Sequence, residues 1–145
     1  MRISLGTDHA GFELKEAVKQ WLTDHGHDVK DFGAHSADSC DYPLFVRPAA
    51  EAVAGGQADY AIVFGGSGNG ENIVANKVRG VRSTVCWSEQ TAIWARGHNN
   101  ANCLALGART IDAAMALRIV ELFLSTPFEG GRHARRVHMI ESESE

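Results

Sequence analysis

Short apolar runs alternate along the chain with longer segments in which apolar residues recur at helical spacing. Runs rich in β-branched and aromatic side chains predict strands, and the helical periodicity predicts amphipathic helices. The predicted strands span residues 2–6, 27–32, 60–64, 82–87 and 103–106. The predicted helices span residues 12–25, 43–53, 71–78, 88–97 and 112–123, the last two capped by Ser88 and Asp112, and a short final helix carries the C-terminal arginines.

Strands that alternate with helices at this spacing predict a parallel sheet with helices on both faces. We therefore expect an α/β fold, a three-layer α/β/α sandwich around a five-stranded parallel sheet. The strand at residues 27–32 is shorter and more polar than the others, which indicates a position near an edge. Pro48 lies inside the second helix and weakens that prediction, because proline removes a helical hydrogen bond.

Length and composition restrict the class of protein. A chain of 145 residues is long enough for one domain with a real core, which we expect over residues 1–140, followed by an acidic, disordered tail over 141–145. A net charge of −4 speaks against nucleic-acid and membrane partners. Three cysteines without close spacing, no signal peptide and no membrane-spanning apolar run indicate a cytoplasmic protein.

A glycine-rich loop follows the strand at residues 60–64, with glycines at 65, 66, 68 and 70. Glycine lets backbone N–H groups crowd around a bound group, and the helix that follows adds about half a positive charge at its N-terminus. The loop therefore predicts an anion socket. Two alternatives stay open. One is a tight turn without a ligand, and the other is a nucleotide site, although Gly66-Ser-Gly68-Asn-Gly70 is one residue short of the dinucleotide fingerprint and Glu89 would have to bind the ribose.

Glu71 ends the glycine loop. A glutamate in the first turn of a helix is common and slightly stabilising, which is the simplest interpretation of Glu71 alone. Beside a socket of free N–H groups, a carboxylate has a second use. It can remove a proton from the carbon next to a carbonyl while the socket holds the developing oxyanion.

Polar residues follow four of the predicted strands. In a parallel α/β fold, ligands bind outside the carboxyl ends of the strands, so these residues should share one edge of the sheet. They are Thr7-Asp8-His9, residues 65–71, Ser88-Glu89 and Gly107-Ala108-Arg109. A glycine socket together with histidine, acidic residues and arginine predicts a site for a phosphorylated small molecule.

The remaining candidates have simpler interpretations beside the functional ones. Arg109, Arg132 and Arg136 suit a phosphate, which arginine binds with two parallel hydrogen bonds, but the last two also suit a solvated helix face. His98 suits a helix C-terminus as well as a catalytic site. Asp8-His9 could ligate a metal, yet no spaced partner accompanies it, so we predict no metal site.

Six motifs, in this order, resemble those of the ribose-5-phosphate isomerase B family, which also contains the galactose-6-phosphate isomerase subunits. They are Gly6-Thr-Asp-His-Ala-Gly-Phe-Glu-Leu-Lys15, Asp41-Tyr42-Pro43, Gly65-Gly-Ser-Gly-Asn-Gly-Glu71 with Ala75-Asn76-Lys77, His98-Asn99-Asn100, Gly107-Ala-Arg109 and Arg132-His-x-x-Arg136. The match covers nearly the whole chain. Six ordered motifs are far more specific than the glycine loop alone.

The resemblance implies aldose–ketose isomerisation of a phosphorylated sugar through an enediol, without metal or cofactor. Ribose 5-phosphate and ribulose 5-phosphate are the expected substrates, and a tetrose, allose or galactose phosphate is the alternative. The resemblance also implies a Rossmann-like fold and a homodimer or dimer of dimers with the active site at the interface.

Residue roles follow from the same resemblance. His98 would assist opening of the furanose ring with support from Asp8, and Tyr42 and Asn99 would line the sugar site. The loop would hold the enediolate oxygen through Gly66, Ser67, Gly68, Asn69 and Gly70. The phosphate would be held by His9, Arg109, and Arg132 with Arg136 from the neighbouring subunit.

The chain departs from one branch of the family, which uses a cysteine at the end of the third strand as its base. Gly65 occupies that position here, and none of the three cysteines is near the loop in sequence. A second branch, similar to actinobacterial enzymes, uses a glutamate at the end of the loop. Glu71 is therefore the expected base.

Overall fold

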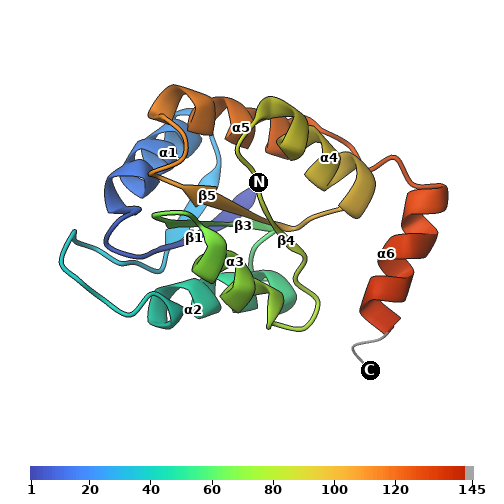
Figure 1. The fold of residues 1–145 in the computed structure, drawn as a ribbon, viewed down its shortest axis with the longest axis horizontal. Coiled ribbons are helices and arrows are strands. Elements are labelled where there is room, and N and C mark those ends of the chain that lie inside the picture. The colour runs from blue at the N-terminus through green and yellow to red at the C-terminus, as the bar shows by residue number, and fades with distance from the viewer. Residues whose placement is uncertain (143–145) are drawn as a thin grey trace.

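The computed structural model describes residues 1–142. Five parallel strands form one sheet in the order β2-β1-β3-β5-β4 (Figure 1). The strands are β1 (Arg2–Thr7), β2 (Asp28–Asp31), β3 (Tyr60–Gly65), β4 (Ser83–Val85) and β5 (Cys103–Gly107). The helices are α1 (Phe12–Asp24), α2 (Pro43–Ala54), α3 (Asn69–Asn76), α4 (Glu89–Asn99), α5 (Ala113–Ser125) and α6 (Arg132–Ser142).

Helices cover both faces of the sheet and confirm the three-layer α/β/α prediction. α1, α4 and α5 lie on one face, and α2 and α3 lie on the other (Figure 1). Because successive side chains of a strand point to opposite faces, β3 and β5 each contribute to two apolar cores. The strand residues of the core under α1, α4 and α5 are Ile3, Leu5, Ile62, Phe64, Leu104 and Leu106. Those of the core under α2 and α3 are Ala61, Val63, Cys103 and Ala105.

The strand order explains where a ligand site can form. β2 is an edge strand, as its polar sequence predicts, and β1, β3 and β5 are adjacent in the centre. The connections that leave the carboxyl ends of these three strands therefore meet at one edge of the sheet.

Most element boundaries differ from the sequence predictions by one or two residues, and the differences at the start of α3 and the end of α4 have a structural explanation. α3 begins at Asn69 rather than Glu71, because Gly68, with φ of 83°, forms the turn into the helix. α4 continues past the predicted end at Gly97 as far as Asn99, and Asn100, with φ of 46°, supplies the left-handed cap. β4 is shorter than predicted, and α2 continues through Pro48.

α6 stands apart from the sheet and contacts α4 (Figure 1). None of its residues is buried, and Met139 and Ile140 are exposed. The helix includes Glu141, whose carboxylate pairs with Arg82. Residues 141 and 142 of the predicted acidic tail thus belong to the last turn of α6, and residues 143–145 lie outside the described part of the chain.

Across residues 1–142, every helix is too short or too polar to pass through a bilayer.

Candidate active site

The glycine loop between β3 and α3 is tied to the turns that follow β1 and β5. The Asp8 amide donates to the carbonyl oxygen of Phe64 at 3.2 Å. On the other side of the loop, the Arg109 amide donates to the carbonyl oxygen of Gly66 at 2.9 Å. The common edge predicted for the turns after β1, β3 and β5 is confirmed.

The turn after β4 takes a different partner. β5 separates β4 from β3, and the Glu89 carboxylate pairs with the Arg118 guanidinium of α5, with 2.5 Å between Oε1 and Nε. Glu89 is therefore not brought to the glycine loop. This placement argues against Glu89 as a ribose-binding acid.

The loop presents free hydrogen-bond donors. The Ser67 hydroxyl accepts from the Asn69 amide at 3.2 Å, and the first turn of α3 closes with a bond from the Asn72 amide to Gly68 O at 2.9 Å. Among the hydrogen bonds of residues 1–142, the amides of Ser67, Gly68 and Gly70 have no acceptor. Unpaired amides at a helix N-terminus attract negative charge, as the anion-socket prediction requires.

Glu71 is buried beside these donors, with only 3% of its surface exposed. Burial raises the pKa of its carboxyl to about 7, and the charge and hydrogen bond of the neighbouring Asp8 carboxyl raise the pKa further, against the lowering effect of its own backbone amide. A side chain on Gly65 would begin only 2.2–2.4 Å from the carboxylate atoms of Glu71. Glu71 thus fills the space that a longer residue at position 65 would occupy.

Other predicted sugar and phosphate residues surround the loop. The Tyr42 hydroxyl lies over Gly70, 2.4 Å from where a Cβ would stand, and the Arg109 guanidinium lies 3.1 Å from the equivalent point on Gly66. His9 is exposed at the same edge, and its backbone amide lowers the pKa of the nearby Cys40 thiol against the larger raising effect of burial. Sequence reasoning missed Cys40, because a single cysteine in a polar loop carries no specific signal.

The remaining predicted residues lie at the opposite edge of the sheet. α4 runs back from the carboxyl end of β4, so its last turn carries His98 and Asn99 to the amino ends of the strands. There the carbonyl oxygen of Asn99 accepts from Arg82 Nε at 3.2 Å, just before β4. Arg132 and Arg136 are exposed on α6 nearby, well away from the glycine loop (Figure 1). A single chain therefore does not bring these four residues to the glycine loop.

His98 has two neighbours that the sequence did not predict. Its Nε2 lies 3.2 Å from Glu129 Oε2, and its ring stacks on His133 with 4.4 Å between centroids and 5° between planes. One ligand atom from each of the three residues lies within 4.8 Å of the others, which is close enough to consider a metal ion. The imidazole planes are parallel, however, so their in-plane lone pairs do not converge on one point.

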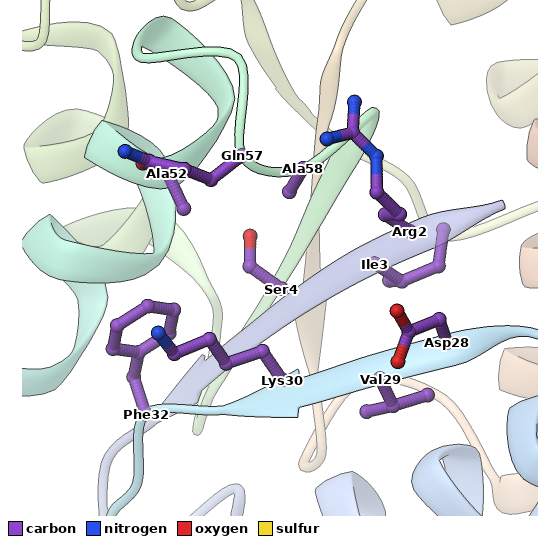
Figure 2. A pocket seen from close by; sticks show the side chains of 10 residues that line it. All are labelled: Arg2, Ile3, Ser4, Asp28, Val29, Lys30, Phe32, Ala52, Gln57 and Ala58. Atoms are coloured by element: carbon purple, nitrogen blue, oxygen red, sulfur yellow. The ribbon is translucent and has the colours of Figure 1, made fainter.

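A separate cavity of about 320 Å³ lies between β1, β2 and the end of α2 (Figure 2). Its polar side chains are those of Arg2, Ser4, Asp28, Lys30 and Gln57. The Arg2 guanidinium is already paired with Asp59. No predicted site residue lines this cavity.

Comparisons with known proteins agree with these motifs. The family model described as Ribose/Galactose Isomerase matches residues 3–140. Ribose-5-phosphate isomerase B of Mycobacterium tuberculosis is 46% identical over 97% of this chain and 88% of that protein. The Escherichia coli K12 protein of the same name is 41% identical over 96% of this chain and 93% of that protein.

Solved structures are equally similar. Ribose-5-phosphate isomerase B of Clostridium thermocellum superposes with a TM-score of 0.98 at 45% identity, over 99% of this chain and 97% of that chain. The Mycoplasma genitalium enzyme with bound ribulose-5-phosphate superposes with a TM-score of 0.95 at 37% identity, over 99% of this chain and 95% of that chain. On this evidence, the chain belongs to the ribose/galactose isomerase family.

Proposed function

We propose that this protein interconverts ribose 5-phosphate and ribulose 5-phosphate through an enediolate, with Glu71 as the base. The observation that carries the proposal is a buried carboxyl, with its pKa raised to about 7, beside unpaired loop amides. Relatives named ribose-5-phosphate isomerase B, at 46% and 41% identity, support this choice of substrate.

The chemistry requires one proton to move from C2 to C1 and one proton to move from O2 to O1. Glu71 takes the proton from C2 of the open-chain aldose, and the electrons pass to the carbonyl oxygen to form the enediolate. The hydroxyl proton on O2 passes to O1, and the same carboxyl returns a proton to C1, which leaves the ketose with its carbonyl at C2 and a hydroxyl at C1. A base with a pKa near 7 is suited to both steps at neutral pH.

The loop stabilises the charge made in the first step. The free amides of Ser67, Gly68 and Gly70 hold the enediolate oxygen, and Asn69 shapes the turn between them. Preorganised donors of this kind contribute about 3–4 kcal/mol each to transition-state stabilisation. His9 and Arg109 hold the phosphate from this side, and Tyr42 lines the sugar site.

A second copy of the chain supplies the rest of the site. His98, Asn99, Arg132 and Arg136 lie too far from Glu71 to meet the same sugar within one chain, yet all four side chains are partly or fully exposed. In a dimer with two-fold symmetry, the glycine loop of each chain would contact α6 of the partner, so the same shared site would form twice. The exposed apolar side chains of Met139 and Ile140 on α6 are consistent with burial by such a contact.

Two other functions remain as alternatives. A tetrose, allose or galactose phosphate would use the same base and socket, with the loop at residues 33–42 setting the size of the pocket. A nucleotide-binding module would need an acid for the ribose, and Glu89 is paired with Arg118 instead.

The test is a panel of four-, five- and six-carbon aldose phosphates, assayed with the purified full chain. We expect the highest kcat/KM with ribose 5-phosphate. A higher kcat/KM with another sugar phosphate would change the proposed substrate but not the proposed mechanism. A chain that isomerises none of them and is stabilised by dinucleotides would overturn the proposal.

A further inference from the structure

Glu129 lies in the segment between α5 and α6 and contacts the last turn of α4. Its backbone amide donates to the carbonyl oxygen of Gly97 at 3.0 Å. Its carboxylate Oε2 lies 3.2 Å from His98 Nε2. A Cβ on Gly97 would stand 2.8 Å from the same carboxylate oxygen, so a glycine next to His98 leaves the space that Glu129 uses.

We infer that Glu129 is a positioning residue for His98, which fixes the orientation and tautomer of the imidazole for opening of the sugar ring. The inference rests on the proposed function, because it takes His98 as the residue that opens the furanose. It adds a residue that neither the motifs of the sequence nor the relatives' names identify.

The hydrogen-bonding capacity of the two groups decides the tautomer. An ionised carboxylate only accepts, so the pair is satisfied when Nε2 of His98 carries the hydrogen. In the neutral ring the lone pair is then on Nδ1. His133 stacks on one face of the ring, which restricts rotation of its plane. Glu129 and His133 together hold the ring with Nδ1 as its free nitrogen.

A free Nδ1 suits the ring-opening step. When the C1–O4 bond of the furanose breaks, the hydroxyl on C1 loses its proton and becomes the aldehyde oxygen, and O4 gains a proton and becomes a hydroxyl. The two oxygens share C1, so one nitrogen can reach both. Nδ1 accepts the proton from the C1 hydroxyl and returns it to O4, and Nε2–H stays on Glu129 throughout.

The simpler interpretation of Glu129 is an exposed ion pair. Its side chain is 58% exposed, and pairs of this kind contribute little to folding. A third interpretation is a purely structural residue, and the three differ in what they predict. A surface pair would change neither stability nor rate, a purely structural residue would change both directions of the reaction, and a positioning residue would change only the step that needs ring opening.

Ribulose 5-phosphate provides the discriminating assay, because it has no free hydroxyl that could close a furanose. Exchange of its C1 hydrogen with deuterated water needs Glu71 and the loop but not ring opening. For Glu129→Ala in the assembled full-length enzyme, we expect about a tenfold or larger fall in kcat from ribose 5-phosphate, against the 10²–10⁴-fold effect usual for a whole acid–base group. Exchange into ribulose 5-phosphate should stay within about twofold of the unaltered protein.

Glu129→Gln keeps an acceptor oxygen and should recover part of the lost rate. Glu121→Gln is the matched control, because Glu121 is also about half exposed and also paired, here with Arg118. Unchanged turnover from ribose 5-phosphate in Glu129→Ala would overturn the inference, as would an equal loss of exchange. His98→Asn separates this inference from the role on which it rests. If His98→Asn turns over ribose 5-phosphate normally, the ring-opening role itself is wrong, and if only Glu129→Ala is normal, Glu129 alone is wrongly assigned.

Discussion

The carboxylate of Glu71 lies where a side chain on Gly65 would begin, 2.2–2.4 Å from the position of a Cβ. A base carried by a side chain at position 65, as the sequence resemblance implies for one branch of the family, would therefore occupy the same space as the Glu71 carboxylate. One chain has room for only one of them. The pairing of a glycine at 65 with a glutamate at 71 follows from this steric exclusion.

Gly65→Ala is expected to displace the Glu71 carboxylate without removing it. Moving a catalytic group by about 1 Å lowers turnover by about 10²-fold, so a loss of this size is expected in kcat. Gly55→Ala is the control, since a Cβ there meets chiefly the flexible side chain of Gln57. If Gly65→Ala folds, as shown by circular dichroism, and keeps normal turnover, the steric relationship does not constrain catalysis.

Glu71→Gln should remove turnover and leave sugar-phosphate binding largely intact. The amide cannot accept the proton, and acid–base catalysis of this kind contributes about 10²–10⁴-fold. Both isomerisation and deuterium exchange into ribulose 5-phosphate should fall, while the Kd of a non-reacting phosphate competitor, measured by calorimetry, should change little. Near-normal exchange in the variant would show that another group is the base.

The pH dependence of turnover should report the raised pKa of Glu71. A base works when deprotonated, so kcat/KM is expected to rise with pH through about 7 and then level off. Asp8→Asn removes a neighbouring carboxyl that raises the pKa of Glu71, so the midpoint should move to lower pH. Because burial is the larger cause and persists, the midpoint should stay above the ordinary glutamate value.

The quantity to compare is the midpoint of the kcat/KM profile against pH. The maximum value of kcat/KM is not informative here, because Asp8 also has a proposed role in ring opening and its loss would lower that maximum. Asp28→Asn on the exposed edge strand is the control and should leave the midpoint in place. A midpoint that moves upward in Asp8→Asn would contradict the coupling.

Arg136→Ala tests whether the site is shared between two chains. Loss of a charge-assisted hydrogen bond of about 1.5–3 kcal/mol should raise KM about 10–150-fold. Mixing this variant with Glu71→Gln under conditions of subunit exchange should restore activity, because one of the two sites in each mixed dimer has both native residues. Random exchange predicts up to about a quarter of the native activity. Absence of recovery, with exchange proven by differently tagged chains, would exclude a shared site.

Asp31→Asn should destabilise the fold around the base of the loop at residues 33–42. Lys15 is fully buried, and its Nζ lies 2.7 Å from both Asp31 Oδ2 and the carbonyl oxygen of Ala34. Removing the partner of a buried charge costs about 3–5 kcal/mol, which urea denaturation would measure. Lys19→Ala, which removes the exposed partner of the same carboxylate, should cost less than about 1 kcal/mol. An equal loss of unfolding free energy in the two variants would contradict the conclusion that Asp31 stabilises the fold chiefly by pairing with the buried Lys15.

Local sequence patterns were sufficient for the helices, the strands and the anion socket. The apolar run at residues 60–64 and the glycines after it determine a strand that ends in an open turn whatever the rest of the chain does. The alternation of elements then determines a parallel sheet, and with it the edge at which Asp8 and Arg109 meet the loop. Periodicity was less informative at helix ends. Gly97 suggested a stop, but α4 continues to Asn99 and is capped by the left-handed Asn100, three residues after the predicted end.

Contacts between distant segments could not be predicted from local patterns. The burial of Glu71 against Asp8 and Gly65, which raises its pKa, exists only once β1 and β3 are paired. The separation of His98 from Glu71 likewise depends on the strand order and on the direction of α4, which returns the chain to the opposite edge of the sheet. The amino-acid sequence by itself thus determined which chemical groups are available. Only the tertiary structure decided which of them meet in one chain and which need a second copy, because burial and proximity depend on how the elements pack.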